Sequence, residues 1–435
     1  MRDLGGHEIA DIRVKLKSRF GLLKQTLKES FYLIEIGIVL ISLISIIRLV
    51  LGEKRKGVDG IAQAHRSTRS SFIKRLLEPV IVRNVGHVYQ CVHVDAAARS
   101  ILEQHFGKRL LVLKGPLRGR EKGVLYVMFS EMFHLIPRAF DMGRLLKDYR
   151  LVLEPSWAGY CNEDILHFTK YDDAIYVGAA ESSDYDFLRR LESNLVPLRF
   201  GAGDWIDPRL FVLDVPSNGR KYDLLMNAHW GWGKRHYVLF RLLRKLPPET
   251  KVALIGFPWD GRKTRDLLAL AEYYGVNDQI TVFESVSYER VVQITAQCKI
   301  GLLLSLKEGA NRAMTECMFC NVPVIVLAEN IGGVKKNVND RTGRIVPERQ
   351  LASEIAFMLH RLDSYSPRQW ALNNISCLVT SRILNERIKS DAVKAGEPWT
   401  QDLAVKTNAP ELKYFDERDA SRLQKCNSDL VRYCV

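Results

Sequence analysis

Short apolar runs alternate with helix-like segments along most of this chain, in two separate series. The first series has apolar runs at 109–116, 123–130, 150–155, 174–179 and 195–200, with helical patterns at 134–146 and 183–192. The second has apolar runs at 222–229, 251–257, 279–284, 300–306 and 322–327, with helical patterns at 237–245, 263–274, 288–298, 351–362 and 367–394. This alternation is typical of βα units that build a largely parallel sheet.

A segment rich in Gly, Pro, Asp and Asn separates the two series at residues 201–222. Such a composition predicts a boundary. We therefore expect two doubly wound, Rossmann-like α/β domains, at residues 75–215 and 216–395, and 435 residues are enough for both. Ligands of such sheets bind in the crevice at the carboxyl ends of the strands.

Residues 31–51 (FYLIEIGIVLISLISIIRLVL) form a long apolar stretch, and its 21 residues are enough to cross a bilayer as a helix. Glu35 and Arg48 interrupt it near its ends, where we expect both side chains to reach the lipid headgroups. The lead-in is too long for a cleaved signal peptide. Three interpretations stay open: a membrane anchor that spans or lies in the plane, a buried helix of a soluble protein, and a helix that binds a partner.

The positive charge is concentrated around this stretch. Residues 1–75 hold fifteen Lys/Arg against seven Asp/Glu, which is +8 of the total of +14. Basic residues beside an apolar stretch favour an anionic membrane surface over nucleic acid, whose binding domains interleave basic and aromatic residues on a folded face. Within the N-terminal region 1–74 we expect an amphipathic surface helix at residues 13–28 and a linker at 53–71. Residues 396–435 are expected to form a C-terminal tail.

The eight cysteines are scattered, which is no disulfide framework in a chain of this length and indicates a reducing compartment. Cys317 and Cys320 form a Cys-x-x-Cys without a second pair at zinc spacing. We expect both to act as small packing residues on a helix.

The stretch from Lys307 to Val326 (KEGANRAMTECMFCNVPVIV) carries the strongest chemical signal. A strand ends at Leu306, Asn311 is a good N-cap, and a helix is predicted from Arg312 to Cys320. Its first turn points free N–H groups and a positive dipole end at the crevice, which suits a diphosphate. Carboxylates accept hydrogen bonds from vicinal hydroxyls, so glutamates at 308 and 316 indicate diols on either side of that diphosphate. The pattern therefore suggests a nucleoside-diphosphate sugar.

The same stretch resembles the Glu-x7-Glu signature of family 4 glycosyltransferases, a group of retaining enzymes with the GT-B fold, in which two Rossmann-like domains face a cleft. The resemblance implies that Glu308 binds the donor sugar and Glu316 the ribose of the nucleotide. It implies further that backbone amides around Gly309, Ala310 and Asn311 hold the sugar and phosphates.

Further similarity extends over roughly residues 220–365. The segments 331–334 and 338–347 resemble the family pattern after the next strand, and VALIGF resembles a family strand that ends in glycine, here Gly256. Lys234 stands where the family has a phosphate-binding lysine.

The chain departs from the family pattern at three places. His229 replaces an arginine five positions before Lys234, so Arg235 is the alternative second charge. Lys335-Lys336 stands near the position of a usual glutamate. The Gly-Gly loop of the amino-terminal domain is missing, and residues 114–123 are its nearest substitute.

Two features of the first domain each allow a functional and a structural interpretation. His134 follows a strand, where the family often has an active-site histidine, but a hydrogen-bonded core histidine fits equally well. Trp157 to Tyr160 either stack on an acceptor sugar or belong to the core.

The sequence thus predicts a retaining glycosyltransferase that moves a sugar from a nucleotide sugar to a saccharide or lipid-linked acceptor, in surface polysaccharide biosynthesis. The resemblance implies no metal or other cofactor. The basic, apolar start places the protein at the cytoplasmic face of a membrane. Two alternatives stay open: another GT-B enzyme such as a nucleotide-sugar epimerase, and a non-catalytic GT-B subunit of a polysaccharide assembly complex.

Overall fold

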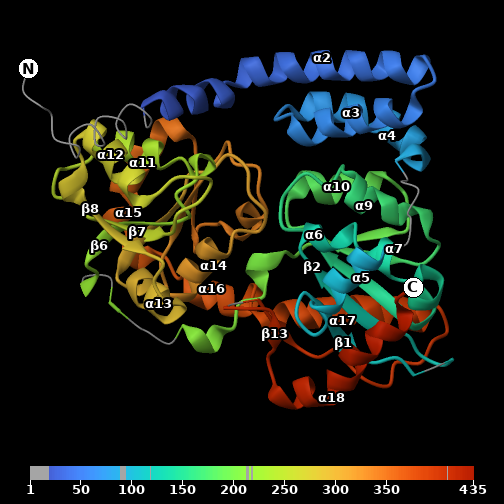
Figure 1. Cartoon of the computed structure of the whole chain (residues 1–435). Coiled ribbons are helices and arrows are strands. Elements are labelled where there is room, and N and C mark those ends of the chain that lie inside the picture. The colour runs from blue at the N-terminus through green and yellow to red at the C-terminus, as the bar shows by residue number, and fades with distance from the viewer. Residues whose placement is uncertain (1–18, 89–94, 118, 212–214, 217–218, 409) are drawn as a thin grey trace, which may run out of the picture.

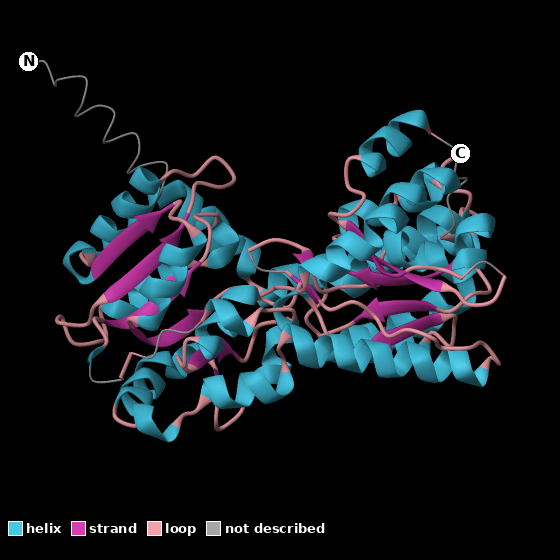
Figure 2. Ribbon diagram, turned by 90° about the horizontal axis from the view of Figure 1, so that it is seen from below, coloured by secondary structure: helices cyan, strands magenta, loops and turns pink. Residues whose placement is uncertain are grey.

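The computed structural model describes residues 19–88, 95–117, 119–211, 215–216, 219–408 and 410–435. Two α/β units stand side by side, each with its own sheet (Figure 1). Seen from below, helices cover both sheets (Figure 2). The expected pair of α/β units with largely parallel sheets, preceded by an apolar helix, is confirmed. The reversal of strand order that marks a doubly wound unit is present in the second sheet, whereas the first sheet follows the order of the sequence.

The first unit is built on a five-stranded sheet in the order β1-β2-β3-β4-β5. Its strands are β1 (Leu110–Lys114), β2 (Gly123–Met128), β3 (Tyr149–Glu154), β4 (Ile175–Gly178) and β5 (Leu195–Leu198). A short loop joins β1 to β2, so this pair is antiparallel, whereas the later strands are joined through helices and run parallel. The helices are α5 (Ala96–Glu103), α6 (Ser130–Phe133), α7 (Ile136–Ala139), α8 (Met142–Asp148), α9 (Glu163–Leu166) and α10 (Ser182–Arg190).

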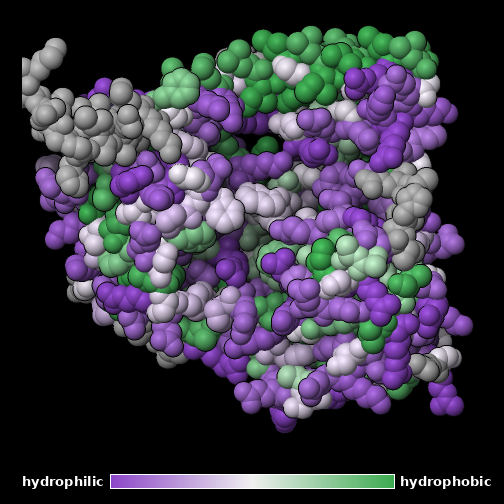
Figure 3. Space-filling model, in the orientation of Figure 1, coloured by the Kyte–Doolittle hydropathy of each residue, from purple (hydrophilic) through white to green (hydrophobic). Residues whose placement is uncertain are grey.

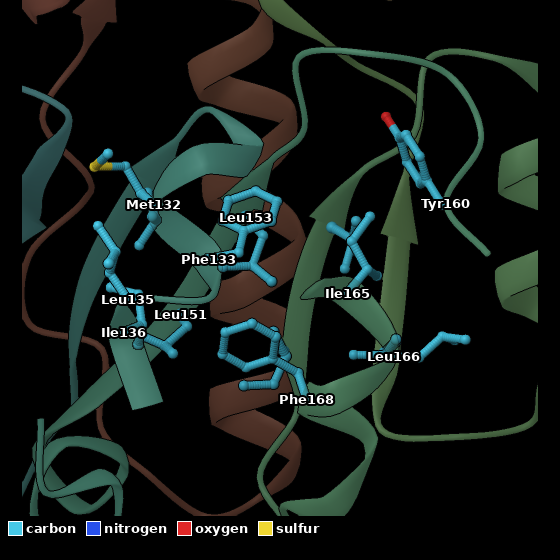
Figure 4. Packing of buried hydrophobic residues seen from close by; sticks show 14 of the residues in the cluster. Met132, Phe133, Leu135, Ile136, Leu151, Leu153, Tyr160, Ile165, Leu166 and Phe168 are labelled. Atoms are coloured by element: carbon cyan, nitrogen blue, oxygen red, sulfur yellow. The ribbon is translucent and has the colours of Figure 1, made fainter. Parts of the chain in front are cut away.

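Apolar side chains fill the space between this sheet and its helices. Met132 and Phe133 of α6, Leu153 of β3 and Ile165 and Leu166 of α9 belong to one buried cluster, in which Phe133 lies beside Leu153 (Figure 4). The strands read as continuous apolar runs because both faces of the sheet are covered.

The second unit is built on a six-stranded sheet in the order β11-β10-β9-β6-β7-β8, and all its pairs are parallel. Its strands are β6 (Tyr222–Asn227), β7 (Val252–Gly256), β8 (Ile280–Glu284), β9 (Cys298–Leu303), β10 (Val324–Leu327) and β11 (Gly343–Val346). Its helices are α11 (His236–Leu243), α12 (Thr264–Tyr274), α13 (Tyr288–Ala296), α14 (Arg312–Phe319) and α15 (Leu351–Leu359). Strand order reverses between β9 and β6, so the loops after these two strands open the crevice where such sheets bind ligands.

The C-terminal part of the chain, from residue 367, returns to the first unit. The predicted helix at 367–394 is two helices, α16 (Pro367–Asn374) and α17 (Cys377–Lys394), and the break at Ile375 lets the chain cross back. Residues 396–435 were expected to be a tail, but they contain α18 (Glu417–Asp429), which packs beside β1. Leu423 of this helix and Leu430 directly after it lie in the core. Its polar outer face hid this helix from periodicity arguments, because few apolar positions mark it.

The apolar stretch forms α2 (Phe31–Val50), which lies antiparallel to α3 (Lys54–Ser67) and is followed by α4 (Ser71–Asn84) (Figure 1). The linker expected at 53–71 is wrong, since most of it is α3. A Cβ on Gly60 would lie 2.1 Å from Ser45 Oγ, so the two helices cross at a distance that only glycine allows.

The expectation that Glu35 reaches the lipid headgroups is also wrong. Its carboxylate is buried and accepts hydrogen bonds from Thr68 Oγ1 (2.6 Å) and the Arg69 backbone N–H (2.7 Å), at the turn between α3 and α4. Glu35 therefore fixes α2 to the rest of the protein. Arg48, by contrast, is exposed.

Candidate functional site

The loops after β6 and β9 bring two of the predicted site residues together. Lys234 follows β6, Glu308 follows β9, and the Lys234 ammonium donates a hydrogen bond to the Glu308 carboxylate. Glu308 is 5% exposed. The Glu308 backbone N–H donates to Ile331 O (2.9 Å), and the Gly333 N–H donates to Gly309 O (3.0 Å). The segment after β10 thus holds the Glu308 loop in place.

The helix predicted after this loop is confirmed as α14. The Asn311 side chain caps it by accepting a hydrogen bond from the Met314 backbone N–H (3.2 Å). Glu316, one turn on, is buried at 5% exposure and accepts a hydrogen bond from Tyr288 Oη (3.1 Å). Burial raises the pKa of Glu316, against the opposing effects of the Arg312 charge and the Tyr288 hydrogen bond.

A pocket of about 270 Å³ opens at the start of α14. Both glutamates line it, together with the loop that the sequence assigned to sugar and phosphate. Its lining residues are Ser156, Asn227, Glu308, Gly309, Ala310, Asn311, Arg312, Ala313 and Glu316. We call it the α14 pocket.

The first unit contributes the opposite wall of the α14 pocket through the segment after β3. A Cβ on Gly309 would lie 2.2 Å from Ser156 O, so glycine here permits a close approach between the two units. The Lys234 ammonium lies 5.7 Å from the ring centroid of Trp157, within range of a cation–π contact. The α14 pocket therefore sits between the two α/β units.

His229 lies beside this site but does not replace the family arginine as a charge. Burial, followed by the nearby Lys234 charge, lowers its pKa to about 4, so the ring is neutral at pH 7. Its Nδ1 accepts a hydrogen bond from the Gly231 N–H (3.1 Å), and its ring lies 5.1 Å from that of Trp259.

Arg235, the alternative second charge, does not line the α14 pocket and is engaged elsewhere in this structure. Its guanidinium is buried and hydrogen bonds to Glu29 (2.9 Å), to Glu348 (2.8 Å) and to Leu304 O (3.1 Å). Lys234 and Arg235 are neighbours, but the left-handed backbone at Arg235 (φ 64°) sends their side chains to different partners.

Two further predicted residues lie outside the α14 pocket. A Cβ on Gly256 would lie 2.2 Å from Ala228 O, so the close packing of β7 against the chain after β6 accounts for this glycine. His134 is exposed at the end of α6 and interacts electrostatically with Asp164. Lys336, where the sequence departs from the family pattern, pairs with Asp204 (2.8 Å). Asp204 belongs to the segment that links the two units.

Sequence reasoning missed Tyr288 and Trp259. Tyr288 begins α13 and meets Glu316 only through the packing of α13 beside α14. Trp259 is 54% exposed after β7. In the sequence it stands among Pro258, Asp260 and Gly261 directly after the predicted strand 251–257, and an aromatic residue in a turn at the carboxyl end of a strand is the signal that could have found it.

A comparison with protein families matches residues 214–369 to the family described as glycosyl transferases group 1. Residues 214–369 are therefore similar to a glycosyltransferase group 1 domain. This domain contains the whole second sheet, both glutamates and Lys234.

Solved structures extend the likeness to both units. The sucrose-phosphate synthase of Thermosynechococcus elongatus aligns with a TM-score of 0.50 and 16% identity over 63% of this chain and 74% of its own. HepE of Anabaena, solved in complex with UDP, aligns with a TM-score of 0.50 and 13% identity over 61% of this chain and 78% of its own. At such identities the likeness describes the fold, and the fold is GT-B. A search of curated protein sequences finds no match.

Proposed function

We propose that this protein is a retaining glycosyltransferase of the family 4 type, which moves a sugar from a nucleoside-diphosphate sugar to a saccharide or lipid-linked acceptor. One observation carries the proposal. Glu308, Glu316 and the capped start of α14 line one pocket, with Lys234 bonded to Glu308 at its edge. Carboxylates that flank an anion-binding helix end match a ligand with hydroxyl groups on both sides of a diphosphate.

Each residue has a distinct task in the proposed reaction. Glu308 binds hydroxyls of the donor sugar, and Glu316 binds the ribose. The acceptor oxygen bonds to the anomeric carbon while the bond from that carbon to the phosphate oxygen breaks. The nucleoside diphosphate leaves with the bonding electrons and takes the acceptor proton on the same face. Lys234 and the first N–H groups of α14 stabilise its charge, which is usually the largest catalytic contribution in such sites.

UDP-sugars are the first donors to test, since HepE of Anabaena was solved with UDP. We propose to titrate the protein with UDP-, GDP-, ADP- and dTDP-sugars and follow its melting temperature. A ligand at a hundredfold its dissociation constant adds about 2.7 kcal/mol to the free energy of unfolding. We expect one donor to raise the melting temperature and the double variant Glu308→Gln, Glu316→Gln to lose transfer. Full transfer activity in that variant sinks the proposal.

A non-catalytic subunit is the second candidate. This candidate is favoured by the lack of a second cation beside Lys234. His229 is neutral, and the Arg235 guanidinium is bonded to Glu29 and Glu348. It predicts either no donor-induced shift or a shift without turnover. A measured turnover that depends on Glu308 rules it out.

We further propose that the protein lies at the cytoplasmic face of a membrane, with α2 in the membrane plane. Residues 33–50 of α2 are long and apolar enough to cross a membrane. Its inner face, however, packs on α3 through Ser45, and Glu35 accepts hydrogen bonds from the turn after α3, so spanning would pull apart buried hydrogen bonds. Its outer face is apolar along its length (Figure 3). The exposed residues are Leu33, Ile36, Val39, Leu40, Leu43, Ile44, Ile46, Ile47 and Val50.

The helix at residues 19–29 extends this face. Phe20, Leu23 and Leu27 are exposed on it, and Lys24 and Lys28 are exposed beside them. At 1.5 Å per residue the two helices give a strip on the order of 45 Å long. Apolar residues flanked by lysines fit the surface of an anionic bilayer.

Vesicle flotation tests this placement. We expect binding to phosphatidylglycerol vesicles that exceeds binding to phosphatidylcholine vesicles, and loss of binding in the variant Leu43→Glu, Ile47→Glu. Ile345→Glu, at an exposed apolar residue of β11, is the matched control and should still bind. If the double variant floats as well as the unaltered protein, the membrane face lies elsewhere.

A further inference from the structure

A second cavity lies between the α2–α3 hairpin and the first unit. Its volume is about 700 Å³, which falls in the usual range of about 300–1,000 Å³ for small-molecule sites. The hairpin lines it with Arg48, Lys56, Asp59, Gln63 and Arg66, and the first unit with Ser130, Trp157, Gly159, Asn162, Glu163 and Asp164. The first-unit residues follow β2 and β3, so they lie at the carboxyl ends of parallel strands, where α/β sheets bind ligands. We call it the hairpin cavity.

The segment 155–160 is a common wall of the hairpin cavity and the α14 pocket. Ser156 lines the α14 pocket, whereas Trp157 and Gly159 line the hairpin cavity. Lys307, next to Glu308, donates a hydrogen bond to Arg66 O (3.0 Å), and a Cβ on Gly159 would lie 3.0 Å from its ammonium. A ligand in the hairpin cavity would therefore lie beside the donor residues, separated from them by one short segment.

The lining of the hairpin cavity suits a polyhydroxylated group. It is lined by three carboxylates, two side-chain amides and three cations, without a strong excess of either charge. The Asn162 amide caps α9 and Glu163 accepts a hydrogen bond from Arg55, so Gln63, Asp59, Asp164 and the three cations are the main groups that a ligand would meet. Trp157 is 54% exposed, and an aromatic face of this kind packs against the apolar face of a sugar ring. A simple anion would be held by cations alone, so a saccharide matches the lining better.

The hairpin also connects this cavity to the proposed membrane face. Arg48 of α2 lines the cavity, while Ile44 and Ile47 of the same helix are exposed on the apolar outer face. We propose that the hairpin cavity binds the saccharide head of a membrane-held acceptor lipid, whose apolar tail stays in the bilayer beside α2. This inference rests on the proposed function, since it assigns the acceptor of that reaction.

Photo-crosslinking tests the assignment without requiring turnover. The probe is hexadecyl maltoside with a diazirine on its sugar, placed in vesicles of phosphatidylethanolamine and phosphatidylglycerol with the full-length protein. We expect the label on peptides that contain residues 59–66 or 157–164. Label confined to the outer face of α2, or to the second unit, overturns the proposal.

A pair of variants sharpens the experiment. Gln63→Trp places a bulky ring in the hairpin cavity, and Ser67→Trp, at an exposed residue of the same helix that does not line it, is the control. We expect Gln63→Trp to lower labelling of 157–164 at least about tenfold, which corresponds to 1.4 kcal/mol of binding free energy, with vesicle flotation unchanged. Equal labelling in the two variants overturns the proposal.

The donor titration separates this inference from the proposed function. If a nucleotide sugar raises the melting temperature but the label misses the cavity, the transferase proposal stands and the acceptor site lies elsewhere. If the label reaches the cavity but no donor binds, the cavity is a glycolipid site of a non-catalytic protein and the proposed transfer is wrong.

Discussion

At the residue scale, the site is organised by one ion pair. Lys234 and Glu308 come from loops after different strands, yet they bond to each other in the free protein. A donor that places its diphosphate at Lys234 and its sugar at Glu308 would insert between them. The pair therefore holds both side chains in place before the donor arrives, and binding exchanges one set of charge-assisted contacts for another.

Replacing Lys234 should mainly slow the chemical step. Lys234→Ala removes a cation from the departing diphosphate, and loss of one such group costs on the order of 10² to 10³ in kcat. Lys263→Ala, at an exposed lysine that begins the α12 helix, is the control and should keep its rate. Steady-state kinetics with the donor found by titration decides, and an unchanged kcat in Lys234→Ala would remove this lysine from the reaction.

The Glu316 carboxylate should lower the stability of the free protein and provide donor binding in return. Its carboxylate is buried, and the raised pKa means that burial disfavours the charged form. Glu316→Gln keeps an oxygen to accept the Tyr288 hydrogen bond but carries no charge, so we expect a higher melting temperature for the free protein at pH 7. The donor-induced shift should disappear, because the amide oxygen is a weaker partner for ribose hydroxyls. A variant that is less stable and still binds donor contradicts both parts.

Sequence reasoning reached the glutamates because their spacing and helix start form one local motif. The sequence assigned phosphate binding to Lys234 by its position and offered Arg235 for the same role. Two neighbouring cations cannot be told apart from sequence, because the backbone angles that direct their side chains are not known at that stage. The left-handed conformation at Arg235 and the acceptor Glu29, about two hundred residues away, are not local features. Tyr288 was missed for the same reason, as its contact with Glu316 arises from packing between helices.

At the element scale, the α2–α3–α4 group is fastened to the first unit by a buried polar cluster. His65 of α3 contacts Glu78 of α4 (3.2 Å), and Arg190 of α10 makes two hydrogen bonds to the same carboxylate (2.8 and 2.9 Å). The helix α3 was not predicted because its apolar positions are few and its polar face is strongly basic. Its few apolar positions pack against α2, α4 and the first unit, and these tertiary contacts cannot be read from the local sequence.

Acid should loosen this fastening. Burial acts to raise the pKa of Glu78, but the His65 and Arg190 hydrogen bonds outweigh it and lower that pKa to about 2. Burial also lowers the pKa of His65. Both pKa values lie below those of the unfolded chain, so the folded state binds fewer protons. The stability they contribute is complete above about pH 6.5 and is lost as the pH falls.

Calorimetry of Glu78→Gln measures this contribution. We expect its melting temperature to lie below that of the unaltered protein at pH 7, and the gap to close between about pH 4.5 and pH 2, where the wild-type carboxylate takes up its proton. Glu272→Gln, at an exposed carboxylate of α12, controls for general charge effects. A gap that is independent of pH would mean that the Glu78 charge contributes nothing.

At the scale of the whole molecule, the chain joins its two units at more than one place. Residues 201–211 form one link, and α16 with α17 forms a second, since the Cys377 N–H donates to Ile206 O (3.0 Å). A third contact lies on the proposed membrane side. The helix at 19–29 rests on the second unit, with Leu22 against its core, while α2 rests on α3 beside the first unit. In the proposed reaction, a closure of the two units around donor and acceptor would have to bend this N-terminal connection.

Arg235 is the anchor of that third contact, and its replacement should separate anchoring from donor binding. Arg235→Ala leaves Glu29 and Glu348 without their shared partner, and breaking a buried ion pair from one side costs about 3–5 kcal/mol. Glu29 still accepts a hydrogen bond from Tyr237 and Glu348 still pairs with Arg241, so the loss of stability should stay below that figure. We expect faster hydrogen exchange at residues 19–29 and an unchanged donor-induced shift in melting temperature. Glu29→Ala removes the other partner of the Arg235–Glu29 contact and should likewise speed hydrogen exchange at residues 19–29. If Arg235→Ala instead weakens donor binding while residues 19–29 stay protected, Arg235 moves to the diphosphate when the donor binds, and the third contact opens with it.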